Sequence, residues 1–137
     1  MTAALFTNEV VTQADQAAVR KVLLAPTKLP LWATEVTRVT AVADDYLVER
    51  TDAALNSQER LHVSTTDDQV TYQSYDGRVD YRVVFTLKTQ EGQTLIQEAF
   101  YLTTSPSWLP VPLLAPIAKH AFHQELAHLA VLAEQPQ

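Results

Sequence analysis

The chain has 137 residues, no cysteine, two glycines and a formal net charge of -6, and 47% of its residues are hydrophobic. This length and composition predict one domain, residues 1–137, with a core of its own. They exclude a collagen-like repeat, low-complexity disorder and a disulfide scaffold. The basic residues are scattered among more numerous acidic ones. Because an acidic chain repels phosphate backbones, no nucleic-acid partner is expected.

The hydropathy pattern gives no sign of a signal peptide or a membrane span. Met1–Val11 has neither a basic region nor an apolar run of signal-peptide length. The longest apolar candidate, Trp108–Ala118, is broken by prolines and ends at Lys119, well short of the roughly 18 residues that a span needs. We therefore expect a soluble cytoplasmic protein.

The first part of the chain predicts one strand followed by two helices. Leu5–Val11 is rich in β-forming residues and reads as a strand. Thr12 and the next three residues fit the capping-box pattern, and apolar residues at helical spacing predict a helix over Gln13–Leu24 that the Thr12 hydroxyl caps. Pro26 ends this helix. Lys28–Trp32, bounded by prolines, predicts one short helical turn.

From Val36 onward the apolar residues alternate with period two, which is typical of strands. Pairs of turn-forming residues separate the strands, such as Asp44-Asp45, Asp67-Asp68 and Glu91-Gly92. The expected strands are Val36–Ala43, Tyr46–Thr51, Arg60–Thr66, Gln69–Tyr75, Val79–Thr89 and Leu95–Thr103. In the clearest of them the side chains that share one face are Val79, Tyr81, Val83, Phe85 and Leu87.

The last part of the chain predicts a proline-broken loop, Ser105–Pro112, and then a long helix, Leu113–Glu134. Apolar residues recur in this helix at intervals of three and four, giving a stripe that can lie on a sheet. The stripe consists of Leu114, Ile117, Ala118, Ala121, Phe122, Leu126, Leu129 and Leu132.

This order of elements predicts an α+β fold in which seven antiparallel strands form a curved sheet. The long C-terminal helix would lie across the open side of that sheet. A curved sheet closed by one helix is rarely filled completely by side chains, so we expect an elongated apolar cavity, the kind of site where small apolar ligands bind.

Three segments carry a resemblance to a known superfamily: Val11–Asp15 at the strand-to-helix step, Leu29-Pro30-Leu31-Trp32 before Val36, and Gly77–Tyr81 before the alternating strand. With the order of elements, they resemble the helix-grip fold of the START-like (SRPBCC) superfamily, which includes polyketide cyclases, lipid-transfer domains and plant allergen proteins. The chain looks like a small bacterial member. The resemblance implies a fold and a hydrophobic ligand, but no catalytic residue.

Carboxylates inside the strands are the first candidates for chemistry. Glu9, Glu49 and Glu98 lie in predicted strands, each beside an apolar residue. A glutamate that points into an apolar cavity would have a raised pKa and could act as a general acid or base, and an inward glutamate or arginine could anchor the polar group of a ligand. The alternative is a set of cross-strand ion pairs on the solvated face with the strand arginines, Arg50, Arg60 and Arg82.

Aromatic and helix residues complete the expected cavity wall. Tyr81 should point inward, either as a ligand-orienting hydroxyl or as a core tyrosine bonded to backbone. Trp32 and Trp108 adjoin prolines in loops and would either gate the entrance or fill satellite cores. The residues predicted to bind the ligand are Trp32, Glu49, Tyr81, Val83, Phe85, Glu98, Trp108, Ile117, Ala121 and Phe122.

The sequence contains no motif that indicates a metal or cofactor site. His120 and His123 are three residues apart and have Glu125 and His128 nearby, but no H-E-x-x-H pattern occurs, and we interpret them as a solvated helix flank. The chain also lacks G-x-S-x-G, P-loop and G-x-G-x-x-G motifs. No cofactor and no metal ligand are therefore predicted.

Three functional hypotheses remain open. The first is the binding or carriage of a small hydrophobic or amphipathic molecule, lipid-like or aromatic, in the cavity. The second is a cyclase- or hydratase-like enzyme, which requires two convergent ionisable groups such as Glu49 or Glu98 near Arg82 or a tyrosine. The third is a homodimeric interaction module, which requires an exposed apolar patch around Trp108–Leu114.

Overall fold

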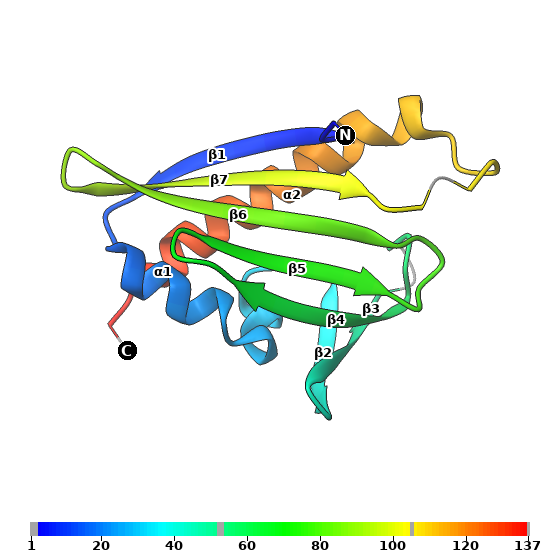
Figure 1. Cartoon of the computed structure of the whole chain (residues 1–137), viewed down its shortest axis with the longest axis horizontal. Helices are drawn as coiled ribbons and strands as arrows, with labels where there is room; N and C mark the ends of the chain where they lie inside the picture. The colour runs from blue at the N-terminus through cyan, green and yellow to red at the C-terminus, as the bar shows by residue number, and fades with distance from the viewer. Residues whose placement is uncertain (1–2, 52–53, 105, 137) are drawn as a thin grey trace.

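One antiparallel sheet and a long C-terminal helix build the molecule (Figure 1). The computed structural model describes residues 3–51, 54–104 and 106–136. Within these ranges the sheet has seven strands in the order β1-β7-β6-β5-β4-β3-β2. The strands are β1 (Phe6–Thr12), β2 (Val36–Val42), β3 (Asp45–Arg50), β4 (Gln58–Thr65), β5 (Gln69–Tyr75), β6 (Tyr81–Gln90) and β7 (Gln93–Leu102).

Consecutive strands from β2 to β7 pair as neighbours, and β1 joins the far edge by pairing with β7. Between β6 and β7, Glu91 and Gly92 have φ angles of 52° and 79°, a left-handed pair that suits the right-handed twist of a hairpin. The turn between β2 and β3 falls one residue earlier than predicted, because Ala43 takes the left-handed conformation, with φ 55°.

The first helix, α1 (Gln16–Leu23), starts later than the sequence predicted. Its cap is Asp15, whose Oδ1 accepts the Ala18 N–H at 2.8 Å. Thr12 does not cap this helix, because its hydroxyl lies 2.9 Å from the carbonyl oxygen of Ala130 at the other end of the chain. The short helix that follows is a 3₁₀ helix, η1 (Pro26–Leu31).

The long helix, α2 (Val111–Ala133), begins two residues before the predicted start. Pro112 falls in its first turn, where a residue without an N–H is tolerated because the first four N–H groups have no partner within the helix. Ser105, the start of the predicted loop, lies outside the described residues. No helix in the described part of the chain is both long and apolar enough to cross a membrane.

The core lies between the concave face of the sheet and α2, which passes behind β1, β7 and β6 in Figure 1. Along β6 and β7 every second residue is buried, as the period-two pattern predicts. The C-terminal half of α2 is deeply buried through Leu126 and Leu129, whereas Leu113 and Ile117 in its N-terminal half are mostly exposed. The predicted α+β architecture is confirmed, and the space left under the N-terminal half of α2 is where hollows remain.

Candidate functional site

Two hollows lie side by side between the sheet and α2, and three residues, Arg50, Tyr81 and Phe122, line both. The outer hollow has a volume of about 200 Å³ and is lined by Glu35, Arg50, Leu55, Asn56, Glu59, Tyr81, Phe100, Ile117, Ala118, Ala121 and Phe122. The inner hollow, of about 30 Å³, is lined by Leu29, Trp32, Ala33, Arg50, Leu61, Tyr72, Tyr81, Val83, Phe85, Glu98, Phe122 and Glu125.

Strand alternation explains why charged side chains reach these hollows. Arg50 is two residues from the buried Val48, so both side chains leave β3 on the concave side. Glu59 stands in the same relation to Leu61 on β4, and Glu98 to Ile96 on β7. Each of these three strands therefore contributes one charged side chain to the concave face.

Arg50 is the centre of a buried polar network. Its Nε donates to Oε1 of Glu59 at 2.5 Å, its Nη1 to Oε1 of Glu35 at 2.9 Å and its Nη2 to the Tyr81 hydroxyl at 3.0 Å. The second oxygen of Glu59 accepts the Ser74 hydroxyl. Burial alone would lower the pKa of Arg50, but Tyr81, Glu59 and Glu35 outweigh it and raise that pKa. Arg50 is thus a fixed cation whose three donor nitrogens are engaged.

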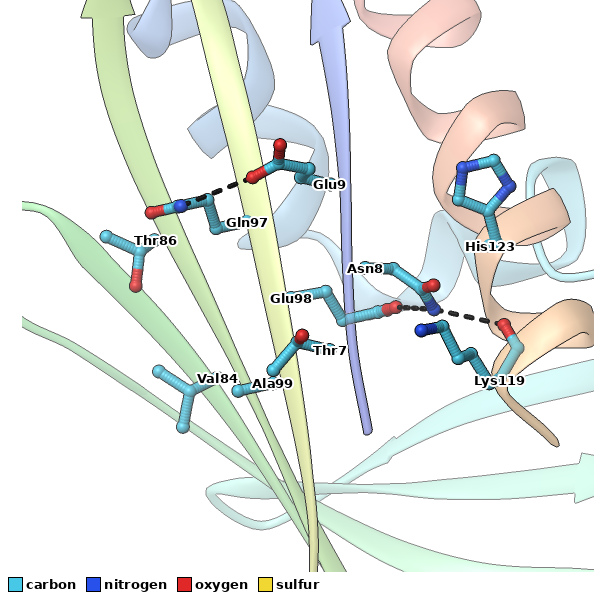
Figure 2. Close-up of a pocket in the computed structure, with 10 residues that line it drawn as sticks. All are labelled: Thr7, Asn8, Glu9, Val84, Thr86, Gln97, Glu98, Ala99, Lys119 and His123. Atoms are coloured by element: carbon cyan, nitrogen blue, oxygen red, sulfur yellow. Dashed lines mark hydrogen bonds between the residues drawn. The ribbon is translucent and has the colours of Figure 1, made fainter. Parts of the chain in front are cut away.

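Two further carboxyl groups, Glu98 and Glu125, face the inner hollow and are not part of the ion pairs of Arg50. Burial raises the pKa of Glu98 to about 8 and the pKa of Glu125 to about 7. Asn8 Nδ2 donates to Oε1 of Glu98 at 3.2 Å and to the Lys119 carbonyl at 3.0 Å, and Figure 2 shows the Glu98 side chain directed toward Asn8. Both groups can hold a proton near neutral pH, so they can donate hydrogen bonds into the hollow.

Aromatic rings supply most of the remaining wall of the inner hollow. The ring of Phe85 makes edge contacts with Trp32 and Tyr72, at centroid distances of 6.3 and 5.3 Å. The Tyr72 hydroxyl donates to the Leu23 carbonyl, which fixes its orientation. Trp32 is 4% exposed, and its indole Nε1 has no hydrogen-bond partner among the described residues.

A third hollow, of about 490 Å³, follows the sheet edge at β1 and is drawn in Figure 2. It is larger than the other two but polar, and it includes outward-facing side chains such as Thr7, Glu9 and Gln97. It therefore lacks the enclosed apolar wall that a site for a hydrophobic molecule needs.

Most of the predicted ligand-binding residues line one of the two hollows between the sheet and α2. The inner hollow includes Trp32, Tyr81, Val83, Phe85, Glu98 and Phe122, and the outer hollow adds Ile117 and Ala121. Glu49 lies on the convex face, because its neighbours Val48 and Arg50 point inward. Trp108 is 50% exposed and lies 4.6 Å under the Arg78 guanidinium, away from both hollows. Glu9 also faces outward, next to Gln97.

Sequence reasoning did not place Glu59, Glu35 or Asn56 in the site, and it left Arg50 open between a surface ion pair and an inward anchor for a ligand. For Glu59 a signal existed, since it alternates with Leu61 and Val63 on β4. Glu125 was weighed only beside the histidines of α2, which are exposed. In the described ranges no three His, Asp or Glu side chains are grouped to hold a metal ion.

The structure is similar to solved structures of low sequence identity. A START superfamily protein from Mycobacterium smegmatis has a TM-score of 0.78 and 13% identity, covering 95% of this chain and 97% of that one. A conserved protein from Geobacillus kaustophilus has a TM-score of 0.75 and 12% identity, covering 93% of each chain.

A third similar structure is the di-domain ARO/CYC StfQ from the steffimycin biosynthetic pathway, with a TM-score of 0.70 and 13% identity. The match covers 94% of this chain and 50% of that chain. No protein-family model and no curated protein matches the chain. At this identity the likeness is one of fold, and the chain has the START-like helix-grip fold.

Proposed function

We propose that the protein binds a small, mostly apolar molecule in the two hollows between the sheet and α2. The observation that carries this proposal is the arrangement of the outer hollow. Its rim includes the exposed side chains of Leu55 and Ile117, and its wall includes the buried Arg50–Glu59–Tyr81 network. An apolar wall that surrounds a few fixed polar groups is typical of small-molecule sites.

The size of the hollows limits the ligand. At about 200 and 30 Å³ they fall below the roughly 300–1,000 Å³ of drug-sized pockets. A single aromatic or short alicyclic body therefore suits them better than a two-chain lipid. The START superfamily and ARO/CYC structures that share the fold support a ligand-binding role by analogy of fold.

A second candidate function is catalysis, and the inward carboxyl groups favour it. The enzyme hypothesis required two convergent ionisable groups, and Glu98 and Glu125 line the inner hollow together with Tyr81. With the pKa of Glu98 near 8 and that of Glu125 near 7, either carboxyl could act as a general acid at neutral pH. A Glu98→Gln variant that binds a substrate but no longer converts it would support this candidate.

The binding proposal is tested by blocking the outer hollow. Ala121 lines it from an exposed position on α2, so an Ala121→Trp variant should fold and fill the space. With 2-naphthol as an uncharged probe, calorimetry should show binding to the wild type and affinity about tenfold or more weaker in the variant.

The matched control is His120→Trp, which adds the same ring one residue away on the exposed helix surface outside both hollows. It should bind the probe like the wild type. If no member of a panel of uncharged one- and two-ring aromatics binds the wild type, or if both variants bind the probe equally, the proposed function is wrong.

A further inference from the structure

The two hollows contain far more acidic than basic groups. Among the described residues that line them, four are glutamates, Glu35, Glu59, Glu98 and Glu125, and the single cation is Arg50. Arg50 forms its ion pairs with Glu35 and Glu59. The salt bridges of the described residues include neither Glu98 nor Glu125. The inner hollow therefore has two carboxyl groups outside any ion pair, and the cation that lines it, Arg50, is already paired with two other glutamates.

Glu125 is the carboxyl most available to a ligand. It is 9% exposed, lines the inner hollow, and makes no side-chain hydrogen bond within the described part of the chain. Around the two carboxyl groups, Asn8 on β1 donates a hydrogen bond to Glu98. Asn8 also donates to Lys119 on α2, and its acceptor there is the backbone carbonyl, not the side-chain ammonium. The other titratable groups of the inner hollow are Arg50 on β3, Tyr72 on β5 and Tyr81 on β6.

We propose that the inner hollow is a site for the protonated amino group of a small aromatic amine, with Glu125 and Glu98 as its acceptors. This inference rests on the proposed function and names the chemical class of its ligand. The apolar body of the amine would occupy the outer hollow. Phe122, which is only half-buried, lines both hollows, and its side chain would turn to let the amino group pass.

The size and wall of the inner hollow fit an ammonium group. A volume of about 30 Å³ accommodates a group of the size of a water molecule. Trp32, Tyr72 and Phe85 present aromatic rings to the same space, and a desolvated cation is attracted to the faces of such rings. A carboxylate ligand, by contrast, would meet two groups that become negative when they ionise.

Proton exchange follows from this arrangement. The amine arrives protonated, one carboxyl of the pair loses its proton to solvent, and the ammonium donates to the resulting carboxylate and to the carbonyl oxygen of the other. Because burial raises the pKa of Glu125 to about 7, protons compete with the amine below that pH. Affinity for the amine should therefore rise as the pH rises from about 6 to about 8.5, where an alkyl ammonium is still charged.

The test compares three probes with the same ring: benzylamine, benzyl alcohol and phenylacetate. At about pH 8.5 we expect benzylamine to bind the wild type about tenfold or more tightly than benzyl alcohol, because a hydrogen bond between two charged groups is stronger than one between neutral groups. Phenylacetate should bind least. At about pH 6 the advantage of benzylamine should shrink to within about threefold. Near pH 7, calorimetry in buffers of different ionisation enthalpy should detect proton release with benzylamine alone.

Three variants distinguish the effect of the two cavity carboxyl groups on affinity from the effect of the overall charge of the protein. Glu125→Gln and Glu98→Gln keep the shape of the protonated acids and should each remove most of the preference for benzylamine over benzyl alcohol. Glu9→Gln makes the same change of charge at an exposed site on the outer side of β1 and should keep that preference.

Each alternative outcome has a defined meaning. If benzylamine and benzyl alcohol bind equally at about pH 8.5, or if the preference survives in both cavity variants, the amine inference is wrong and the proposed function stands. If none of the three probes binds while 2-naphthol does, the amine inference is again wrong and the proposed function stands. If 2-naphthol and the other uncharged aromatics also fail to bind, both are wrong.

Discussion

Arg50 and Glu59 form an ion pair at 2.5 Å in which the Glu59 side chain has no exposure to solvent. The two residues come from the neighbouring strands β3 and β4 and face the same hollow. A buried pair of this kind adds little stability over a well-packed apolar pair, but the loss of one partner leaves the other charge buried and uncompensated.

Replacing Arg50 with methionine should therefore destabilise the protein strongly. We expect Arg50→Met to lower the free energy of unfolding by about 3–5 kcal/mol, measured by urea denaturation, because Glu59 loses its cation. Adding Glu59→Leu to this variant should restore part of the loss. The control is Arg60→Met, since Arg60 forms an exposed pair with Asp76 at 3.8 Å, and its cost should stay below about 1 kcal/mol. Equal costs for the two arginine variants would contradict this account.

Glu98 should make the protein less stable as the pH rises. In the unfolded chain a glutamate loses its proton near its ordinary value of 4.5, whereas in the folded protein the pKa of Glu98 is about 8. Between these values the folded state holds one more proton, so the free energy of unfolding falls with rising pH. The full contribution, reached above pH 8, is about 5 kcal/mol.

A Glu98→Gln variant should match the wild type near pH 4 and exceed its stability near pH 9, because the amide cannot ionise. Chemical denaturation across this range measures the difference. Glu125 acts in the same direction, since burial raises its pKa to about 7. The free energy of unfolding of the Glu98→Gln variant should therefore still fall somewhat as the pH rises. A stability profile that Glu98→Gln leaves unchanged would mean that Glu98 does not titrate in this range.

The side chain of Asn56 should be essential to the loop before β6. Its Nδ2 donates to the Val79 carbonyl at 2.8 Å, and its Oδ1 accepts the Val79 N–H at 2.9 Å, all in a buried setting. Asn56→Ala would leave both backbone groups without partners and should cost about 1–3 kcal/mol in urea denaturation.

Gly77 is coupled to the same contact. A Cβ at this position would lie 2.7 Å from Nδ2 of Asn56, so Gly77→Ala should displace the amide and break its two hydrogen bonds. Because both changes remove the same interaction, the double variant should lose less than the sum of the single losses. Additive losses would show that the alanine is accommodated without moving Asn56.

Thr12 should hold the end of β1 against the C-terminal end of α2. Its Oγ1 is buried and lies 2.9 Å from the Ala130 carbonyl and 2.8 Å from Oε2 of Glu134. Thr12→Val keeps the shape but loses the donor, and we expect a loss of about 1–2 kcal/mol in thermal or urea unfolding. Thr7→Val, at an exposed site on the same strand, should change stability by no more than about 0.5 kcal/mol.

The sequence predicted the architecture because alternation and helical spacing are local and strong. The buried positions of β6, from Tyr81 to Leu87, follow the predicted face residue by residue. The predicted start and cap of α1 were wrong, because the Thr12 hydroxyl bonds to the carbonyl of Ala130, 118 positions away, and does not cap the helix. A local capping pattern contains no information about such a partner.

The candidate site was only partly predictable for the same reason. Tyr81 and Phe85 could be assigned to the hollow from their strand parity. In Leu47–Arg50 and Ile96–Ala99 apolar residues occupy both faces of the strand, which leaves the direction of Glu49, Arg50 and Glu98 open. Only the pairing of β3 with β4, and the position of Glu59 next to Arg50, decide that the arginine faces inward.

The sequence by itself determined the faces of the clearly alternating strands such as β6, the long amphipathic helix and the surplus of acidic residues, since these depend on residue order and composition alone. The tertiary structure decided which carboxyl groups share a cavity and which of them pairs with Arg50. Glu98 and Glu125 are separated along the chain and meet only because β7 and α2 enclose the same space. Their raised pKa values arise from burial, and burial is a property of the packed molecule.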